Sequence, residues 1–469
     1  MMRNFNVPPT GRVPAFRRLC FGATLLLSSF CAVNAQAQDG KAWAAAWTAS
    51  QQGVFAEPAP ATVVPVGDFR PEVFFPQPNA IRFALPGGKA TDQTFRMMVR
   101  PDIWSDTVRI RFSNVFGTEP LVIGSAAVGL QEYSAHLVAG TSVGVMFDGR
   151  PSVTIAPGER LFSDPVALPF YSEAALPLLR GRNLAVSFAV TGTNGSLSYH
   201  DSAEATSYIS LPGSGDVVAS DSGAVFPFTT TSWFILDAVD VMAPEGTKVV
   251  IAFGDSIADG TLSTHNGNDR WPDFLSHRLD EQYGDTVSVV TQAMSGNAVV
   301  SEAIGEPAIK RLQRDVLEVS GVTTVILMEG INDIGSAQNT PEPVIEGYRE
   351  IATRLQAAGI TVIAGTLTPG LRPDQDFSNA TLGSVYGPFY GGTQTDAYRK
   401  QLNEFIRTSG IFDGVIDFEA AVLDPATGAM MEVFTPNSDG GPGDWLHPNR
   451  IGLQAMGAAI DLSLLNLDK

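Results

Sequence analysis

The second half of this chain alternates short apolar runs with stretches of helical periodicity, and no other sequence feature constrains the fold as much. The apolar runs begin near Val249, Val287, Val322, Thr361 and Val415. Strands that alternate with helices form a parallel sheet with helices on both faces. The pattern therefore predicts a flavodoxin-like, three-layer α/β/α domain over residues 246–469.

The first apolar run ends abruptly in polar residues. Val249–Phe253 is a stretch of consecutive apolar residues, as expected for a strand that is buried on both faces. Gly254, Asp255 and Ser256 follow it, so a hydroxyl lies at the carboxyl end of the strand, where open α/β sheets bind their ligands. The same residue types are common in turns, so this segment alone leaves a structural interpretation open.

Other polar residues lie at corresponding places, after later strands or before the last helix. They are Gly296 with Asn297, Asn332, and Asp444 with His447. A serine hydroxyl needs a base to become nucleophilic, and His447, at the head of the last predicted helix, is the best-placed histidine. Asp444 precedes it by three residues, a spacing that lets a carboxylate reach one imidazole nitrogen while the other faces Ser256.

A developing oxyanion also needs hydrogen-bond donors. We expect the backbone N–H groups of Ser256 and Gly296 and the side-chain amide of Asn332 to supply them. Each residue also has an ordinary structural interpretation. Asn332 with Asp333 is typical of a turn or helix cap, and the loop from Asp439 to Asp444 is typical of a solvated loop or a loose cation site.

Taken together, these blocks resemble the SGNH hydrolases, also called the GDSL esterase/lipase family, over roughly residues 248–464. The blocks are Gly254-Asp255-Ser256, Ser295-Gly296-Asn297, Gly330-Ile331-Asn332-Asp333 and Asp444-Trp445-Leu446-His447-Pro448. The resemblance implies that Ser256 is the nucleophile, His447 the base and Asp444 the acid of a triad. It also implies that Gly296 and Asn332 are oxyanion donors beside the N–H of Ser256.

The predicted function is hydrolysis of carboxylic esters by an exported serine esterase, without a metal or organic cofactor. Short-chain or acetyl esters, including esters on carbohydrate, are the expected substrates. Alternatives are a lysophospholipase, an aryl esterase or a non-catalytic carbohydrate-binding protein. The aromatic residues expected to contact a sugar face or aromatic ester are Trp271, Tyr386, Phe389 and Tyr390, and Trp445 is expected to line the acyl pocket.

The first half, residues 40–245, has short strand-like runs separated by Gly- and Pro-bearing turns, which predicts an all-β sandwich of jelly-roll-like type. Gly140–Gly144 matches the Gly-x-Ser-x-Gly elbow of α/β-hydrolases, but a strand-like run follows its serine where the elbow needs a helix. His200 is interpreted as a loop histidine bonded to its neighbours, with a sugar-binding face as the alternative.

Residues 1–37 are predicted to be a cleaved signal peptide, because arginines precede an apolar run that ends in small residues. We therefore expect a secreted or periplasmic protein without a stable membrane anchor. Both cysteines, Cys20 and Cys31, fall in this segment, so the mature chain has no thiol. The formal net charge of −19 disfavours nucleic acid as a partner and leaves small-molecule or glycan esters.

Overall fold

A computed structural model describes residues 40–53, 81–372 and 387–467. Ala37–Lys469 form one compact unit. The predicted signal peptide and Tyr386 lie outside the described residues. Within the described ranges, no helix has both the length and the apolar character that a membrane span requires.

The second half contains the predicted parallel sheet. Its strands lie in the order β17-β16-β18-β19-β20, and every neighbouring pair is parallel. Their bounds are β16 Lys248–Gly254, β17 Val287–Ala293, β18 Val322–Met328, β19 Thr361–Gly365 and β20 Gly414–Ile416. In chain order this is 2-1-3-4-5, the doubly-wound order whose ligands bind at the carboxyl edge near the first strand.

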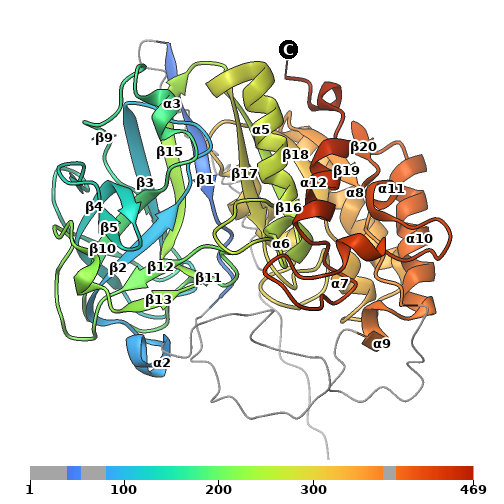
Figure 1. Cartoon of the computed structure of the whole chain (residues 1–469), viewed down its shortest axis with the longest axis horizontal. Coiled ribbons are helices and arrows are strands. Elements are labelled where there is room, and N and C mark those ends of the chain that lie inside the picture. Colours follow the sequence, from blue (N-terminus) through green and yellow to red (C-terminus); the bar gives the residue numbers. More distant parts are fainter. Residues whose placement is uncertain (1–39, 54–80, 373–386, 468–469) are drawn as a thin grey trace, which may run out of the picture. The chain divides into compact units, whose positions relative to one another are not determined.

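Helices cover both faces of this sheet (Figure 1). Val249, Ile251 and Phe253 of β16 belong to one hydrophobic cluster, and the intervening Val250 and Ala252 belong to another. The first cluster includes side chains of α6 (Ala308–Leu312), α8 (Pro341–Ala357) and α10 (Thr393–Thr408). The second includes side chains of α5 (Trp271–Tyr283) and α12 (Arg450–Ala459). Shorter helices are α4 (Ser256–Asp259), α7 (Ile331–Ile334), α9 (Gly387–Tyr390) and α11 (Phe418–Val422).

The sequence pattern also predicts a helical stretch from about Val299 to Val319 with a break or kink at Pro307, and the part before Pro307 is wrong. Residues 297–306 form a loop, and α6 begins at Ala308 with Pro307 as its N-cap. The side-chain amide of Asn297 donates to the carbonyls of Ile304 and Glu306, at 2.7 and 2.9 Å, and these bonds hold the loop in a non-helical path. A π-helical turn over Gln313–Leu317 follows α6.

The first half is rich in antiparallel strands. One sheet has the order β1-β15-β3-β8, and β9 also pairs with β3. A second sheet has the order β13-β12-β2-β10-β4-β5, and β6 and β7 also pair with β4. The short strands β11 and β14 pair with each other. The bounds are β1 Lys41–Thr48, β2 Thr91–Val99, β3 Thr107–Ser113, β4 Leu121–Tyr133, β5 His136–Leu137, β6 Val143–Val145, β7 Val153–Ile155, β8 Arg160–Phe162, β9 Val166–Ala167, β10 Leu184–Thr193, β11 Tyr199–His200, β12 Ser207–Ile209, β13 Phe228–Thr230, β14 Trp233–Phe234 and β15 Leu236–Pro244. Short helices α2 (Ile81–Ala84) and α3 (Leu176–Leu179) accompany them.

The serine of Gly140–Gly144 is followed by strand β6, which pairs with β4. No helix follows this serine, so the geometry of a nucleophile elbow is absent there.

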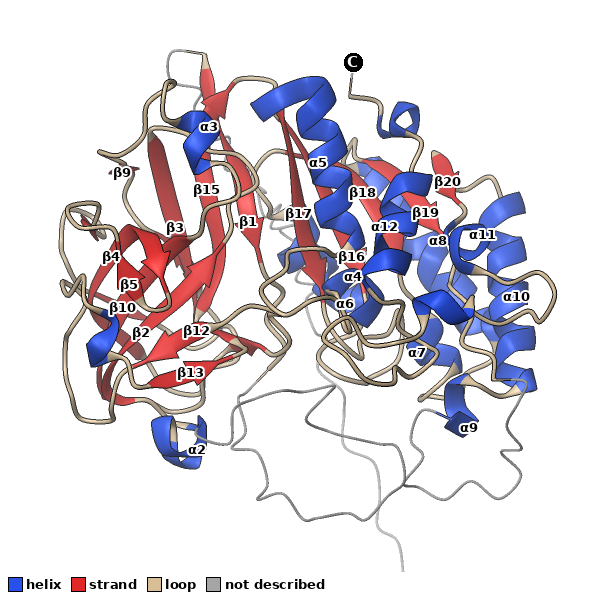
Figure 2. Ribbon diagram, in the orientation of Figure 1, coloured by secondary structure: helices blue, strands red, loops and turns tan. Residues whose placement is uncertain are grey.

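The β-rich half and the parallel sheet contact each other directly (Figure 2). Strand β1 runs beside the edge strand β17, where the Thr48 hydroxyl donates to the carbonyl of Thr291 at 3.0 Å. The alternation of Val108, Ile110 and Phe112 with Arg109 and Arg111 predicts a half-buried strand, but the side chain of Arg111 is buried. It donates to Asp237 at 2.7 Å and to the carbonyl of Glu318 at 3.2 Å, because the second half covers this face of the sheet.

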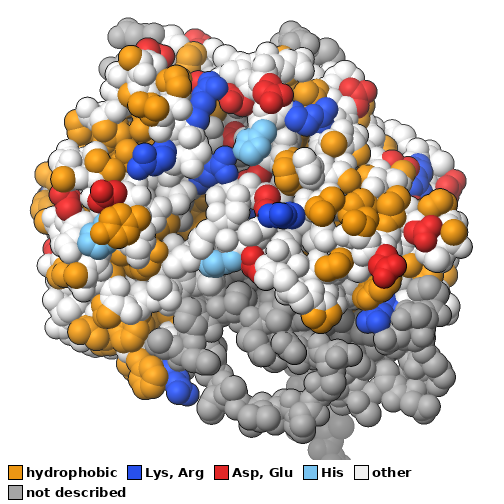
Figure 3. All heavy atoms as spheres, in the orientation of Figure 1, with side chains coloured by type: hydrophobic (Ala, Val, Ile, Leu, Met, Phe, Trp, Pro, Cys, Tyr) orange, Lys and Arg blue, Asp and Glu red, His pale blue; other side chains and the backbone are white. Residues whose placement is uncertain are grey.

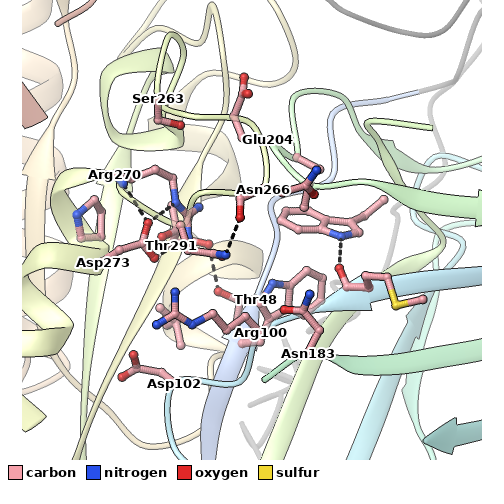
Figure 4. Close-up of a pocket in the computed structure, with 18 of the residues that line it drawn as sticks. Thr48, Arg100, Asp102, Asn183, Glu204, Ser263, Asn266, Arg270, Asp273 and Thr291 are labelled. Atoms are coloured by element: carbon pink, nitrogen blue, oxygen red, sulfur yellow. Dashed lines mark hydrogen bonds and ion pairs between the residues drawn. The ribbon is translucent and has the colours of Figure 1, made fainter. Parts of the chain in front are cut away.

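A cavity of about 270 Å³ lies between the two halves (Figure 4). Its polar lining groups bond one another or the backbone: Arg270 with Asp273, and Asp102 with Ser276 and the N–H of Val289. Ser256 and His447 are not among the lining residues.

On the face drawn in Figure 3, basic and acidic side chains are interspersed and hydrophobic side chains lie in separate groups. The negative net charge is therefore not gathered into one acidic patch on that face.

Candidate active site

Ser256 is the first residue of the short helix α4, directly after β16. The turn requires Gly254, since a Cβ there would lie 2.3 Å from the carbonyl oxygen of Met328. The carboxylate of Asp255 caps the helix by accepting the N–H of Ile257 at 3.1 Å. Asp255, which had no predicted role, therefore holds the turn that presents the serine.

The structure brings Ser256, His447 and Asp444 together. Nε2 of His447 lies 2.7 Å from the Ser256 hydroxyl, and Nδ1 lies 2.5 Å from Oδ2 of Asp444. A carboxylate only accepts hydrogen bonds, so Nδ1 carries a proton and Nε2 is the nitrogen that faces the serine. This order, from hydroxyl to imidazole to carboxylate, is the one that activates a serine.

The loop around Asp444 is built to hold this carboxylate. Its Oδ1 accepts the backbone N–H groups of Leu446 and His447, at 2.9 and 2.8 Å, while Oδ2 faces the imidazole. Trp445 adopts a left-handed conformation with φ of 67°, which lets the chain turn between the acid and the base. Burial acts to raise the pKa of Asp444, but the neighbouring His447 and the hydrogen bonds hold that pKa below its usual range.

The predicted oxyanion donors Gly296 and Asn332 lie on neighbouring loops that are bonded together. The amide of Asn332 donates to the carbonyl of Asn297 at 2.6 Å, next to Gly296. Gly296 has a φ of 78° in a turn closed by the bond from the N–H of Asn297 to the carbonyl of Met294, at 3.0 Å. Asn332 is buried in the first turn of α7.

A buried arginine that the sequence did not single out joins the ends of the strands beneath these loops. Arg311 donates to the carbonyls of Gly254 and Gln292 and to Oδ1 of Asn297, at 3.0, 2.8 and 2.8 Å. It also lies 3.4 Å from a carboxylate oxygen of Glu329. Burial raises the pKa of Glu329 to about 8, and burial likewise raises the pKa of Asp255 to about 7.

The prediction that Trp271 contacts substrate is wrong. Trp271 opens α5 with its side chain 0% exposed, in contact with Phe418, so no ligand reaches its ring. Tyr390 is also buried, so its ring offers no stacking face; its hydroxyl donates to Oδ1 of Asn332 at 2.7 Å. Phe389 and Trp445 are partly exposed and stay candidates for substrate contact.

The other four histidines do not bond to Ser256. His265 bonds Thr206, His277 bonds Arg100, and His136 stacks on Tyr133. His200 is buried in strand β11, which removes the sugar-binding alternative, and it contacts Asp259 of α4.

In the described ranges, no group of three or more His, Cys, Asp or Glu side chains is placed to hold a metal ion.

A buried serine, imidazole and carboxylate at the carboxyl edge of a doubly-wound parallel sheet define a site of the serine hydrolase class. Residues 252–455 match the model of the GDSL-like lipase/acylhydrolase family, and this part of the chain belongs to that family. No curated protein matches the chain.

Several solved structures resemble part of this chain. A member of the lipolytic protein G-D-S-L family from Veillonella parvula DSM 2008 is 20% identical, covers 45% of this chain and 95% of its own, and has a TM-score of 0.32. A carbohydrate acetylesterase family member from Sinorhizobium meliloti is 16% identical, with a TM-score of 0.34; the match covers 47% of this chain and 99% of that protein's chain. The inhibitor-bound aryl esterase of M. smegmatis is 15% identical over 45% and 95%, with a TM-score of 0.34.

Proposed function

We propose that this protein is an exported serine esterase that hydrolyses carboxylic esters through an acyl-enzyme on Ser256. The observation that carries the proposal is the imidazole of His447, which contacts the Ser256 hydroxyl through one nitrogen and Asp444 through the other. The family of residues 252–455 supports the hydrolytic class of the reaction.

In the proposed reaction, Oγ of Ser256 attacks the ester carbonyl while its proton passes to Nε2 of His447. The negative charge on the carbonyl oxygen is stabilised by the N–H groups of Ser256 and Gly296 and by the amide of Asn332. The alcohol then leaves with the proton from His447, and an ester joins the acyl group to Ser256. Water gives a proton to His447 and attacks this ester, which releases the acid and restores the serine. Asp444 stays ionised and stabilises the imidazolium in both steps.

We further propose that the substrates are short-chain or acetyl esters, including esters on carbohydrate. The partly exposed Trp445, between the acid and the base, is suited to line a small acyl pocket, and Phe389 is suited to contact the alcohol portion. The β-rich half, proposed to be a β-sandwich domain, contacts the catalytic half directly and is placed to support the site from one side. Export rests on the signal-peptide pattern of residues 1–37.

The test is a substrate panel on the wild type and Ser256→Ala. Turnover of p-nitrophenyl acetate, butyrate and octanoate measures the preference for acyl length, and turnover of phenyl acetate measures aryl esterase activity. Turnover of a lysophospholipid tests the lysophospholipase alternative, and release of acetate from acetylated xylan tests glycan deacetylation. We expect turnover of acetate esters that Ser256→Ala abolishes. Equal turnover by both proteins contradicts the mechanism, and glycan binding without any hydrolysis by the wild type favours a non-catalytic carbohydrate-binding protein.

A further inference from the structure

We propose that His200, in the β-rich half, is a positioning residue for the oxyanion turn: together with Asp259 it fixes the backbone of Ser295, next to Gly296. This inference rests on the proposed function, since it assigns support to a donor of that same site. It gives the β-rich half a role in positioning the proposed oxyanion donors.

The surroundings of His200 define its charge. Its Nδ1 lies 2.9 Å from the carbonyl oxygen of Ser50, and its Nε2 lies 3.1 Å from Oδ1 of Asp259. A carbonyl oxygen only accepts hydrogen bonds, so Nδ1 carries a proton, while Nε2 faces the Asp259 carboxylate at ion-pair distance without the alignment of a hydrogen bond. His200 and Asp259 are thus a buried ion pair, with each side chain only 2% exposed.

The pKa of His200 is consistent with this charge. Burial is the largest single effect and acts to lower that pKa, but Asp259, the backbone of Ser50 and Asp201 together raise it above its ordinary value. The ring is also held in place, because it stacks on Trp233 with 5.3 Å between ring centroids. Trp233 is itself fixed by a 2.8 Å bond from its indole N–H to the carbonyl of Met98.

The other oxygen of Asp259 reaches the oxyanion turn. Oδ2 accepts both the backbone N–H and the hydroxyl of Ser295, each at 2.9 Å. Ser295 immediately precedes Gly296, whose N–H is a proposed oxyanion donor. Asp259 also ends α4, the helix that begins with Ser256. One carboxylate therefore joins the nucleophile's helix, the oxyanion turn and the β-rich half.

Removal of His200 leaves the Asp259 carboxylate buried without its counter-ion. An unpaired buried charge is strongly unfavourable, so the carboxylate must take up a proton or turn toward water. Either change weakens its hold on the N–H of Ser295 and loosens the position of the Gly296 N–H. An oxyanion donor acts mainly in the transition state, so the loss should appear in kcat rather than in KM.

The experiment measures kcat and KM for p-nitrophenyl acetate in the wild type, His200→Ala, His200→Gln and Asp259→Asn. We expect His200→Ala and Asp259→Asn to lower kcat by roughly tenfold to a hundredfold with KM nearly unchanged, a smaller loss than removal of a donor outright. His200→Gln should recover part of kcat, since its amide can still donate to Asp259. The matched control is His136→Ala, a histidine of the same half stacked on Tyr133, which should keep wild-type kinetics.

Amide hydrogen exchange gives a second readout that does not need activity. In folded His200→Ala, the segment 293–297 should exchange faster than in the wild type, while β18 should keep its protection. If His200→Ala fails to fold, the same measurements on His200→Gln and Asp259→Asn test the positioning role of His200.

Wild-type kcat and unchanged exchange in folded variants would overturn the inference and leave the proposed esterase intact. A wild type without Ser256-dependent turnover would overturn the esterase itself. In that case, exchange at 293–297 that is the same in His200→Ala and in the wild type would show that His200 does not fix the turn at Ser295 either.

Discussion

The hydroxyl of Tyr390 donates a 2.7 Å hydrogen bond to Oδ1 of Asn332. The carbonyl of Asn297 only accepts hydrogen bonds, so the end of the Asn332 amide that faces it is the NH₂ group, and the amide oxygen faces the hydroxyl of Tyr390. Tyr390 thus holds the oxygen of a proposed oxyanion donor without itself facing the substrate.

Tyr390→Phe should therefore reduce catalysis without weakening substrate binding. Loss of the hydroxyl leaves the buried Oδ1 without this donor and loosens the position of the amide, so we expect kcat to fall about tenfold, or about 1.4 kcal/mol. Steady-state kinetics with p-nitrophenyl acetate measure the change. Tyr133→Phe is the control, since Tyr133 is 60% exposed on the β-rich half. Equal kcat in wild type and Tyr390→Phe would show that the amide needs no such support.

Asp444→Asn should lose most activity while the fold survives. An amide carries no charge to stabilise the imidazolium of His447 and favours the wrong tautomer, so kcat should fall by about 10³- to 10⁴-fold. Asp439→Asn, an exposed change on the same loop, should keep wild-type turnover. A loss of less than about tenfold in Asp444→Asn would mean that another group performs this role.

Two tryptophan variants should separate stability from specificity. Trp271→Ala removes a fully buried ring and should lower the free energy of unfolding by about 3–5 kcal/mol, with KM unchanged in the folded protein. Trp445→Ala should change stability much less and should alter the preference for acyl length. Denaturant unfolding measures the change in stability, and the ester panel measures the change in acyl preference. A stable Trp271→Ala protein with an altered acyl preference would contradict the buried position of Trp271.

Glu329→Gln should remove part of the pH dependence of stability. Burial raises the pKa of Glu329 from 4.5 to about 8, although Arg311 opposes the shift and Asp255 adds to it. A raised carboxyl pKa stabilises the fold below the unfolded pKa, and this contribution is lost as pH rises toward the folded pKa. The difference in Tm, Glu329→Gln minus wild type, should therefore increase from about pH 5 to about pH 8.

The surface variant Glu432→Gln is the control, and its Tm difference from the wild type should stay flat over this range. A flat difference for Glu329→Gln as well would show that Glu329 is ionised at its ordinary pKa.

Much of the parallel sheet could be predicted because its strands are buried on both faces and appear as uninterrupted apolar runs. Val322–Met328 is predicted with the bounds that β18 has. The contact of Asp444 with His447 was also accessible, since three residues of a loop separate them. Pairing these two with Ser256, which lies 191 residues before His447, rested on the expected strand order, and the family resemblance supported it.

Other parts of the site depend on tertiary contacts that no local pattern reports. His200 and Asp259 come from different halves of the chain, and only their packing makes them an ion pair. Arg311 contacts the ends of several strands, which depends on the strand order of the sheet. Trp271 was predicted to contact a sugar face or aromatic ester because its ring suits stacking, whereas its ring belongs to the core under α5.

The most direct test of the account is covalent capture of the nucleophile. The wild type, Ser256→Ala and His447→Ala are treated with a fluorophosphonate ester, and intact mass followed by peptide mapping locates the adduct. We predict one adduct per chain on Ser256 in the wild type, none on Ser256→Ala, and much slower labelling of His447→Ala. An adduct at another residue of an active wild type, or esterase turnover that persists in Ser256→Ala, would contradict the proposed mechanism.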